Sequence, residues 1–147
     1  MALIEKIVEF DATAEEVFSI VEHVEGFSNY SVFVEDIIKH PDGTYEWKAD
    51  FFGFKTTWKA RITRSERPNY FEWETISGLH NKGSYHIEDI KSDDIEGGRA
   101  RVTFDMEYDL KGGLLETLAA PMINKAMDIV SKEVMENIAE EIRLRRS

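Results

Sequence analysis

Apolar and polar residues alternate along several short segments between residues 45 and 108, which is the spacing of strands that bury one face. Charged residues occupy most of the intervening positions. Short turns, such as Pro41-Asp42-Gly43 and Glu66-Arg67-Pro68-Asn69, separate the segments. The pattern therefore predicts five or six consecutive antiparallel strands with one solvated face and one covered face.

The first forty residues predict a strand, two helices and a further strand. Residues 4–10 fit a strand. Thr13, with Glu16 three residues later, predicts a helix start, and Gly26 predicts the end of that helix. A second short helix is expected over residues 27–33, followed by a strand over residues 34–40.

The C-terminal part has the period of a helix. Apolar residues recur at helical spacing from Leu114 to Ile142. Pro121 interrupts this run near its beginning, and proline suits the first turn of a helix better than its interior. We therefore expect a short turn followed by a main helix that starts at about Pro121.

One helix cannot fill the covered face of such a sheet. A helix is about 10 Å wide, whereas six strands spaced by about 4.8 Å span roughly 29 Å. Large inward side chains are abundant: Tyr45, Trp47, Phe51, Trp58, Phe71, Trp73, Tyr85, Phe104 and Tyr108. Either they fill the interior as an ordinary core, or they line a pocket for an apolar ligand.

Length and charge narrow the class of protein. The 147 residues fit a single domain, 1–147, and the chain has no cysteine for disulfides, thiolate metal sites or a thiol nucleophile. A net charge of −11 disfavours binding to nucleic acids and to anionic membrane surfaces. Without an apolar stretch of membrane-spanning length or a signal-peptide core, we expect a cytoplasmic protein with no integral membrane association.

Several segments, in their order along the chain, carry a resemblance to a known family. They are residues 7–18 (IVEFDATAEEVF), 25–30 (EGFSNY), 83–87 (GSYHI), 102–108 (VTFDMEY) and 112–115 (GGLL). On these segments the chain resembles the START/SRPBCC superfamily. Within it, the chain is similar to the polyketide cyclase/dehydrase and lipid-transport family, which includes the coenzyme-Q-binding proteins. The proline usual in the second helix of the family is absent here.

The resemblance implies an α+β helix-grip fold: a curved antiparallel sheet, two short helices, and one long C-terminal helix across the concave face. It also implies an apolar cavity between sheet and helix for a lipid, isoprenoid, quinone or polyketide. The expected ligand-binding residues are Tyr45, Trp47, Phe51, Trp58, Ile62, Phe71, Trp73, Thr75, Tyr85, Ile87, Phe104, Tyr108, Leu118, Met122, Met127 and Val130. The entrance is expected between residues 77–83, the short helix near Phe27 and Tyr30, and Pro121.

Three functions remain open on the sequence. The first is binding or transport of a hydrophobic small molecule, without a cofactor, by a monomer or homodimer. The second is a polyketide cyclase, aromatase or dehydratase, for which an inward acid or base is needed; the candidates are His80, Tyr45, Tyr85 and Tyr108. The third is a ribosome- or protein-interaction module. No metal-ligand spacing such as His-Glu-x-x-His occurs, so no metal site is expected.

Overall fold

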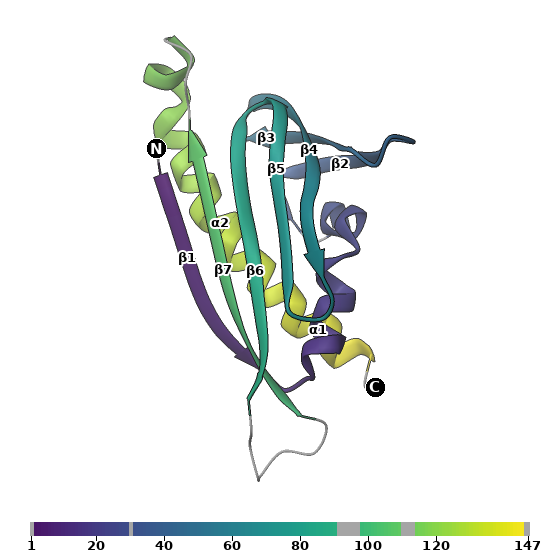
Figure 1. Ribbon diagram of the computed structural model, residues 1–147. Coiled ribbons are helices and arrows are strands. Elements are labelled where there is room, and N and C mark those ends of the chain that lie inside the picture. The colour runs from purple at the N-terminus through teal and green to yellow at the C-terminus, as the bar shows by residue number, and fades with distance from the viewer. Residues whose placement is uncertain (1, 30, 91–97, 110–113, 146–147) are drawn as a thin grey trace.

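The computed structural model describes residues 2–29, 31–90, 98–109 and 114–145 (Figure 1). In chain order the elements are β1 (Ala2–Phe10), α1 (Ala14–Val21), the 3₁₀ helix η1 (Val24–Asn29), β2 (Val34–Lys39), β3 (Tyr45–Phe51), β4 (Phe54–Glu66), β5 (Tyr70–Gly78), β6 (His80–Ile90), β7 (Arg99–Asp109) and α2 (Leu114–Arg145). The predicted order of one strand, two short helices, six strands and one long helix is confirmed.

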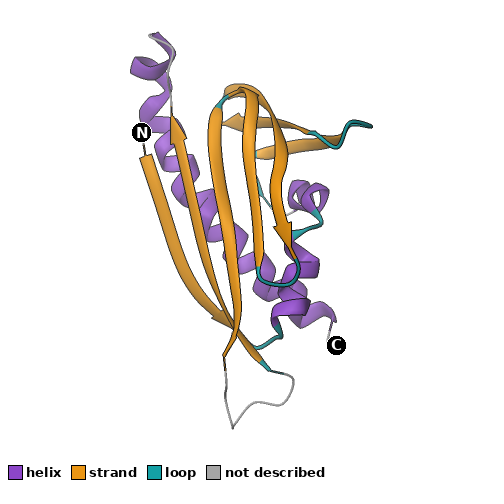
Figure 2. Cartoon of the chain, viewed as in Figure 1, coloured by secondary structure: helices purple, strands orange, loops and turns teal. Residues whose placement is uncertain are grey.

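All seven strands form one antiparallel sheet in the order β1-β7-β6-β5-β4-β3-β2. The long helix α2 runs along one face of this sheet, and α1 lies near the C-terminal end of α2 (Figure 2). The predicted alternation is clear in β7, where every second residue from Ala100 to Tyr108 is buried. The sheet thus has one covered face, which carries the aromatic residues, and one solvated face.

The start of α1 is fixed by its own sequence and by one distant strand. The Glu16 amide donates to Thr13 Oγ1 and the Thr13 amide donates to the Glu16 carboxylate, both at 3.1 Å, which completes the predicted capping box. Asp89, at the end of β6, is exposed, and its carboxylate accepts a hydrogen bond from the Ala14 amide at 2.8 Å. Asp89 therefore anchors α1 to the sheet.

We expect Thr13→Ala to lower the free energy of unfolding by about 1 kcal/mol, because the Glu16 amide loses its acceptor at the helix start. Urea unfolding followed by circular dichroism measures the change. Thr13→Ser keeps the hydroxyl and is expected to stay close to the parent protein. An equal loss in both variants would contradict the capping argument.

The helix after α1 differs from the prediction. The last α-helical residue is Val21, and after Glu22 and His23 the chain forms η1, which contains Gly26 and begins three residues before the expected second helix. The His23 amide donates to the Ile20 carbonyl, and the Gly26 amide donates to the His23 carbonyl. These contacts span three residues, as in a 3₁₀ turn, so Gly26 does not end α1.

The break expected at Pro121 is also wrong, because α2 continues through it from Leu114. A proline inside a helix removes a single backbone donor, which can bend a helix without ending it. Pro121 lies on the exposed side of α2, whereas Ile123, Ala126 and Ile138 are fully buried against the rest of the protein. Burial of that apolar side stabilises the helix despite the proline.

Candidate functional site

A cavity of about 100 Å³ lies between the covered face of the sheet, α1 with η1, and α2. Most of its wall is apolar. The lining residues are Val21, Val24, Ser31, Val34, Tyr45, Trp47, Phe51, Trp58, Ala60, Ile62, Phe71, Trp73, Asn81, Tyr85, Phe104, Met106, Met127, Val130, Glu133, Val134 and Asn137. The interior is therefore not completely filled by the aromatic side chains.

Strand pairing builds an aromatic wall on one side of the cavity. Trp47 of β3 lies directly opposite Trp58 of β4, and their rings stack with centroids 5.5 Å apart. Phe51 stacks on Trp58 at 6.3 Å. Such offset stacking adds to the burial of apolar area and keeps the ring faces fixed. This wall offers a flat apolar surface to a ligand.

A second cluster of aromatic side chains lies on β5, β6 and β7. The Trp73 ring stacks on Phe104 with centroids 5.9 Å apart, and Tyr85 lies 5.1 Å from Phe104. Gly83 makes this arrangement possible. A β-carbon at Gly83 would lie 2.5 Å from the Trp73 ring and 2.4 Å from the Asp105 carbonyl oxygen. Glycine at that position leaves the space that the Trp73 ring occupies.

Asn81 satisfies the polar groups beside Trp73. The Trp73 indole N–H donates to Asn81 Oδ1 at 3.0 Å, and the Asn81 side-chain amide donates to the Leu79 carbonyl at 3.0 Å. The backbone amide of Asn81 donates to Thr75 Oγ1 at 3.1 Å. The buried Asn81 therefore holds the Trp73 ring in one orientation, as expected for a fully paired polar cluster.

Tyr85 has no such partner. Its side chain is only 4% exposed and lines the cavity, and no described residue hydrogen-bonds its hydroxyl. Burial raises the pKa of the Tyr85 hydroxyl far above its ordinary value of about 10. The group is therefore a neutral hydroxyl at any ordinary pH.

The side chain of Glu133 joins α2 to the segment between η1 and β2. Its carboxylate accepts hydrogen bonds from Ser31 Oγ and from the Val32 amide, both at 3.2 Å. Asn137 lines the cavity one helical turn further on. As far as the structure is described, Glu133 is the only acidic residue in the lining, which contains no lysine, arginine or histidine.

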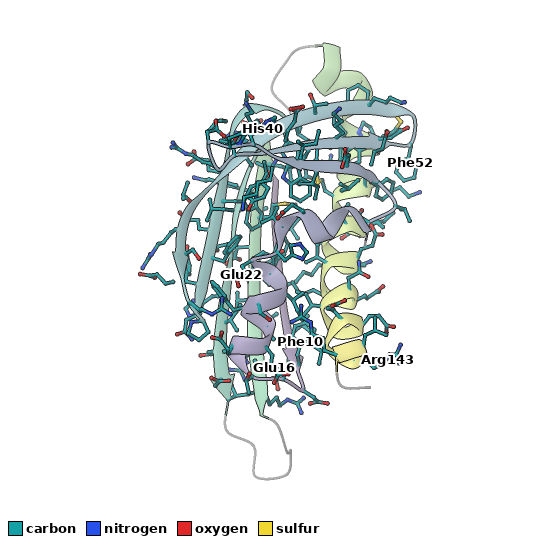
Figure 3. The ribbon with its side chains drawn as sticks, turned by 90° about the vertical axis from the view of Figure 1, so that its right-hand side faces the viewer. Phe10, Glu16, Glu22, His40, Phe52 and Arg143 are labelled. Atoms are coloured by element: carbon teal, nitrogen blue, oxygen red, sulfur yellow. The ribbon has the colours of Figure 1, made fainter. Side chains whose placement is uncertain are left out.

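An exposed aromatic residue stands close to this junction. Phe52, in the turn between β3 and β4, lies beside α2, with Lys125 Nζ 5.8 Å from its ring centroid (Figure 3). On its other side it contacts Phe33, with centroids 5.1 Å apart. The turn between β3 and β4 thus contacts the residue that precedes β2 and Lys125 of α2.

Most of the ligand-binding residues expected from the sequence lie in the lining. They are Tyr45, Trp47, Phe51, Trp58, Ile62, Phe71, Trp73, Tyr85, Phe104, Met127 and Val130. The side chain of Leu118 lies outside the described residues. Their role in binding stays a prediction, because their position shows that they border the cavity and not what they bind.

Four expected site residues lie elsewhere. Thr75 Oγ1 accepts a hydrogen bond from the Asn81 amide, and Ile87 is fully buried in the core. Tyr108 donates its hydroxyl to Asn124 Oδ1 at 2.6 Å, which joins β7 to α2. Met122 is 37% exposed, on the outer side of the helix. Alternation and helical spacing predict the buried side of an element, but not which part of that side borders a void.

The loop expected beside the entrance is wrong. Residues 77–83 form no capping loop, because β5 runs to Gly78 and β6 starts at His80, with Leu79 alone between them. His80 is exposed and outside the lining, and its Nδ1 lies 3.5 Å from Thr75 Oγ1. Tyr30 and the side chain of Phe27 lie outside the described residues. Ser31 and Glu133, which both line the cavity, are hydrogen-bonded where the segment between η1 and β2 meets α2.

Several lining residues were not predicted as site residues. They are Val21, Val24, Ser31, Val34, Ala60, Asn81, Met106, Glu133, Val134 and Asn137. A signal existed for some of them: Val134 and Asn137 follow Met127 and Val130 at helical spacing. Ser31 and Asn81 are small polar residues without a local pattern, and only the folded chain brings them to the cavity.

The model of the family described as polyketide cyclase / dehydrase and lipid transport matches residues 1–143. A comparison with curated proteins finds no match. Among solved structures, the chain is similar to TTHA0849 from Thermus thermophilus, with 18% identity and a TM-score of 0.76 over 99% of this chain and 100% of that one.

Two further solved structures have related folds. A START superfamily protein from Mycobacterium smegmatis has 13% identity and a TM-score of 0.70, over 95% of this chain and 98% of that chain. The Zhui aromatase/cyclase from Streptomyces sp. R1128 has 17% identity and a TM-score of 0.73, over 99% of this chain and 96% of that chain. These similarities confirm the helix-grip, START-like fold. Among the described helices, none is both long and apolar enough to cross a membrane.

Proposed function

The chain belongs to the polyketide cyclase/dehydrase and lipid transport family, and we propose that it binds an apolar small molecule in the cavity between the sheet and α2. The observation that supports the proposal is the cavity itself, which has two clusters of aromatic side chains in its wall and few polar atoms. Ligand sites of this kind are concave and mainly apolar, with a small number of placed polar groups.

The volume limits what the cavity holds. An engineered apolar cavity of about 150 Å³ binds benzene. At about 100 Å³, this cavity is about two thirds of that size, so it suits a short branched chain and takes a small ring only if its wall moves. Met106 and Met127 belong to the lining, and flexible methionine side chains allow a wall to adapt to larger occupants. The inserted part of a longer ligand is therefore expected to be its ring or its branched end.

The lining supports binding better than acid–base catalysis. Within the described lining the titratable groups are Glu133 and two tyrosines, and both Glu133 oxygens already accept hydrogen bonds from the protein. The hydroxyl of Tyr85 is held neutral by burial, which raises its pKa, so it suits hydrogen bonding to a ligand better than proton transfer. His80, the histidine predicted for catalysis, is outside the lining.

Filling the cavity tests the proposal. Ala60 is buried and belongs to the lining, so Ala60→Phe places a ring in the void. We expect the parent protein to bind ethylbenzene in isothermal titration calorimetry, and Ala60→Phe to bind it about tenfold more weakly or not at all. Ala139→Phe, on the exposed side of α2, is the matched control and keeps the parent affinity.

Two checks complete this experiment. Circular dichroism confirms that both variants are folded, and native mass spectrometry with organic extraction identifies any apolar molecule that purifies with the parent protein. Equal affinity of Ala60→Phe and the parent would show that the ligand lies elsewhere. The absence of binding by the folded parent to any neutral apolar probe would overturn the proposal.

A further inference from the structure

We propose that the inserted end of the ligand is a neutral carbonyl compound, a ketone, aldehyde, ester or quinone, whose oxygen accepts a hydrogen bond from Tyr85. This inference rests on the proposed function, since it names the ligand class of the same cavity. It depends on which hydrogen-bond donors of the lining are already paired within the protein and which are not.

Among the lining donors for which no described residue is an acceptor, Tyr85 is the most buried, at 4% exposed; the others are the Tyr45 hydroxyl and the indole N–H groups of Trp47 and Trp58. The Tyr85 ring is enclosed by Phe71, Trp73 and Phe104, with centroid distances of 6.4, 5.6 and 5.1 Å. No described residue accepts its hydroxyl hydrogen, yet no fully buried side-chain oxygen or nitrogen in the described part lacks a partner. The hydroxyl is therefore not sealed within side-chain packing and is open to the cavity.

The neighbouring polar groups are paired with one another. The Trp73 indole N–H donates to Asn81, and the Asn81 side-chain amide donates to the Leu79 carbonyl. A ligand would have to break these hydrogen bonds to use them, whereas a hydrogen bond to Tyr85 costs the protein none. A buried donor without an acceptor is unfavourable, so a ligand that brings an acceptor is preferred over a hydrocarbon of the same shape.

A carbonyl fits a buried donor such as the Tyr85 hydroxyl better than an alcohol does. A carbonyl oxygen only accepts, so one hydrogen bond from Tyr85 satisfies it. An alcohol that accepts from Tyr85 brings a donor of its own into a largely apolar space. The hydroxyl of Tyr85 remains protonated because burial raises its pKa, so it keeps the hydrogen that it donates.

The charge of the lining argues against an anionic ligand. As far as it is described, the lining holds no lysine, arginine or histidine, and its one acidic residue, Glu133, repels a carboxylate. Moving an unpaired carboxylate into an apolar cavity is strongly unfavourable. The cavity is therefore expected to select a neutral carbonyl over a free acid with the same ring.

Four probes of similar shape test the inference in isothermal titration calorimetry: acetophenone, ethylbenzene, 1-phenylethanol and benzoate at neutral pH. We expect acetophenone to bind the parent about tenfold more tightly than ethylbenzene and more tightly than 1-phenylethanol, with benzoate weakest. Equal affinity for acetophenone and ethylbenzene, or tighter binding of 1-phenylethanol or benzoate, would overturn the inference.

Tyrosine-to-phenylalanine variants assign the hydrogen bond to one residue. Tyr85→Phe is expected to lose the preference for acetophenone over ethylbenzene. Tyr108→Phe is the matched control, because the Tyr108 hydroxyl donates a hydrogen bond to Asn124 and both residues lie outside the lining. Tyr45→Phe tests the second tyrosine of the lining. If Tyr45→Phe abolishes the preference and Tyr85→Phe retains it, the assignment to Tyr85 is wrong.

The infrared carbonyl stretch of bound, carbonyl-¹³C acetophenone gives a second readout. A hydrogen bond from Tyr85 lowers this frequency, so Tyr85→Phe is expected to raise it again, a change that altered packing alone does not explain. The same probes distinguish failure of this inference from failure of the proposed function. If ethylbenzene and acetophenone bind equally, the cavity still binds ligands. If no neutral probe binds, the proposed function itself is wrong.

Discussion

Gly78→Ala is expected to lower the free energy of unfolding by about 2–4 kcal/mol, a larger loss than that expected for Thr13→Ala. Gly78 ends β5 with φ +84°, a region that side-chain-bearing residues rarely occupy. An added β-carbon would lie 2.3 Å from the Thr57 carbonyl oxygen and 2.7 Å from the Trp58 α-carbon. Both contacts involve backbone, so β4 itself must shift.

This shift reaches the cavity, because Trp58 faces Gly78 across the strand pair and forms part of the aromatic wall. Urea unfolding followed by tryptophan fluorescence measures the loss. Gly43→Ala is the matched control: Gly43 has φ +87°, but nothing lies within 4 Å of an added β-carbon. It is expected to lose about 1 kcal/mol from backbone strain alone. Equal losses at both positions would show that the close approach at Gly78 contributes nothing.

Alkaline pH is expected to destabilise the protein more than it destabilises Tyr85→Phe. The pKa of Tyr85 is raised in the folded protein by burial, whereas in the unfolded chain it is about 10. Above that pH the unfolded chain releases the proton and the folded protein retains it. The unfolded state then binds fewer protons, so stability falls as pH rises, by up to about 1.4 kcal/mol per pH unit.

Urea unfolding at pH 9 and at about pH 11.5 measures this effect. We expect the loss in the parent to exceed that in Tyr85→Phe by about 2 kcal/mol at the higher pH. The pKa of Tyr108 is also raised, first by burial and then by Asp128, so Tyr108→Phe shows how far a tyrosine whose hydroxyl is hydrogen-bonded within the protein contributes. Identical losses in the parent and Tyr85→Phe would contradict the burial of a neutral hydroxyl at Tyr85.

Local chemistry made parts of the fold predictable. The capping box needs only Thr13 and Glu16, which are three residues apart, and both of its hydrogen bonds form as expected. The aromatic residues on alternate positions of β3 and β4 pair across the strands, because a strand projects every second side chain to the same face. The prediction of α2 failed at Pro121, since packing of distant residues outweighs a single lost donor.

The sequence by itself determined the order of elements, the antiparallel sheet and its aromatic covered face, since these depend on spacing within short segments. Only the tertiary structure decided which inward residues border a void. Tyr85 and Tyr108 occupy equivalent positions in the alternation, yet Tyr108 meets Asn124 of α2 whereas Tyr85 lines the cavity without a described partner. The difference depends on how α2 lies across the sheet, and spacing along a strand carries no information on that contact between distant segments.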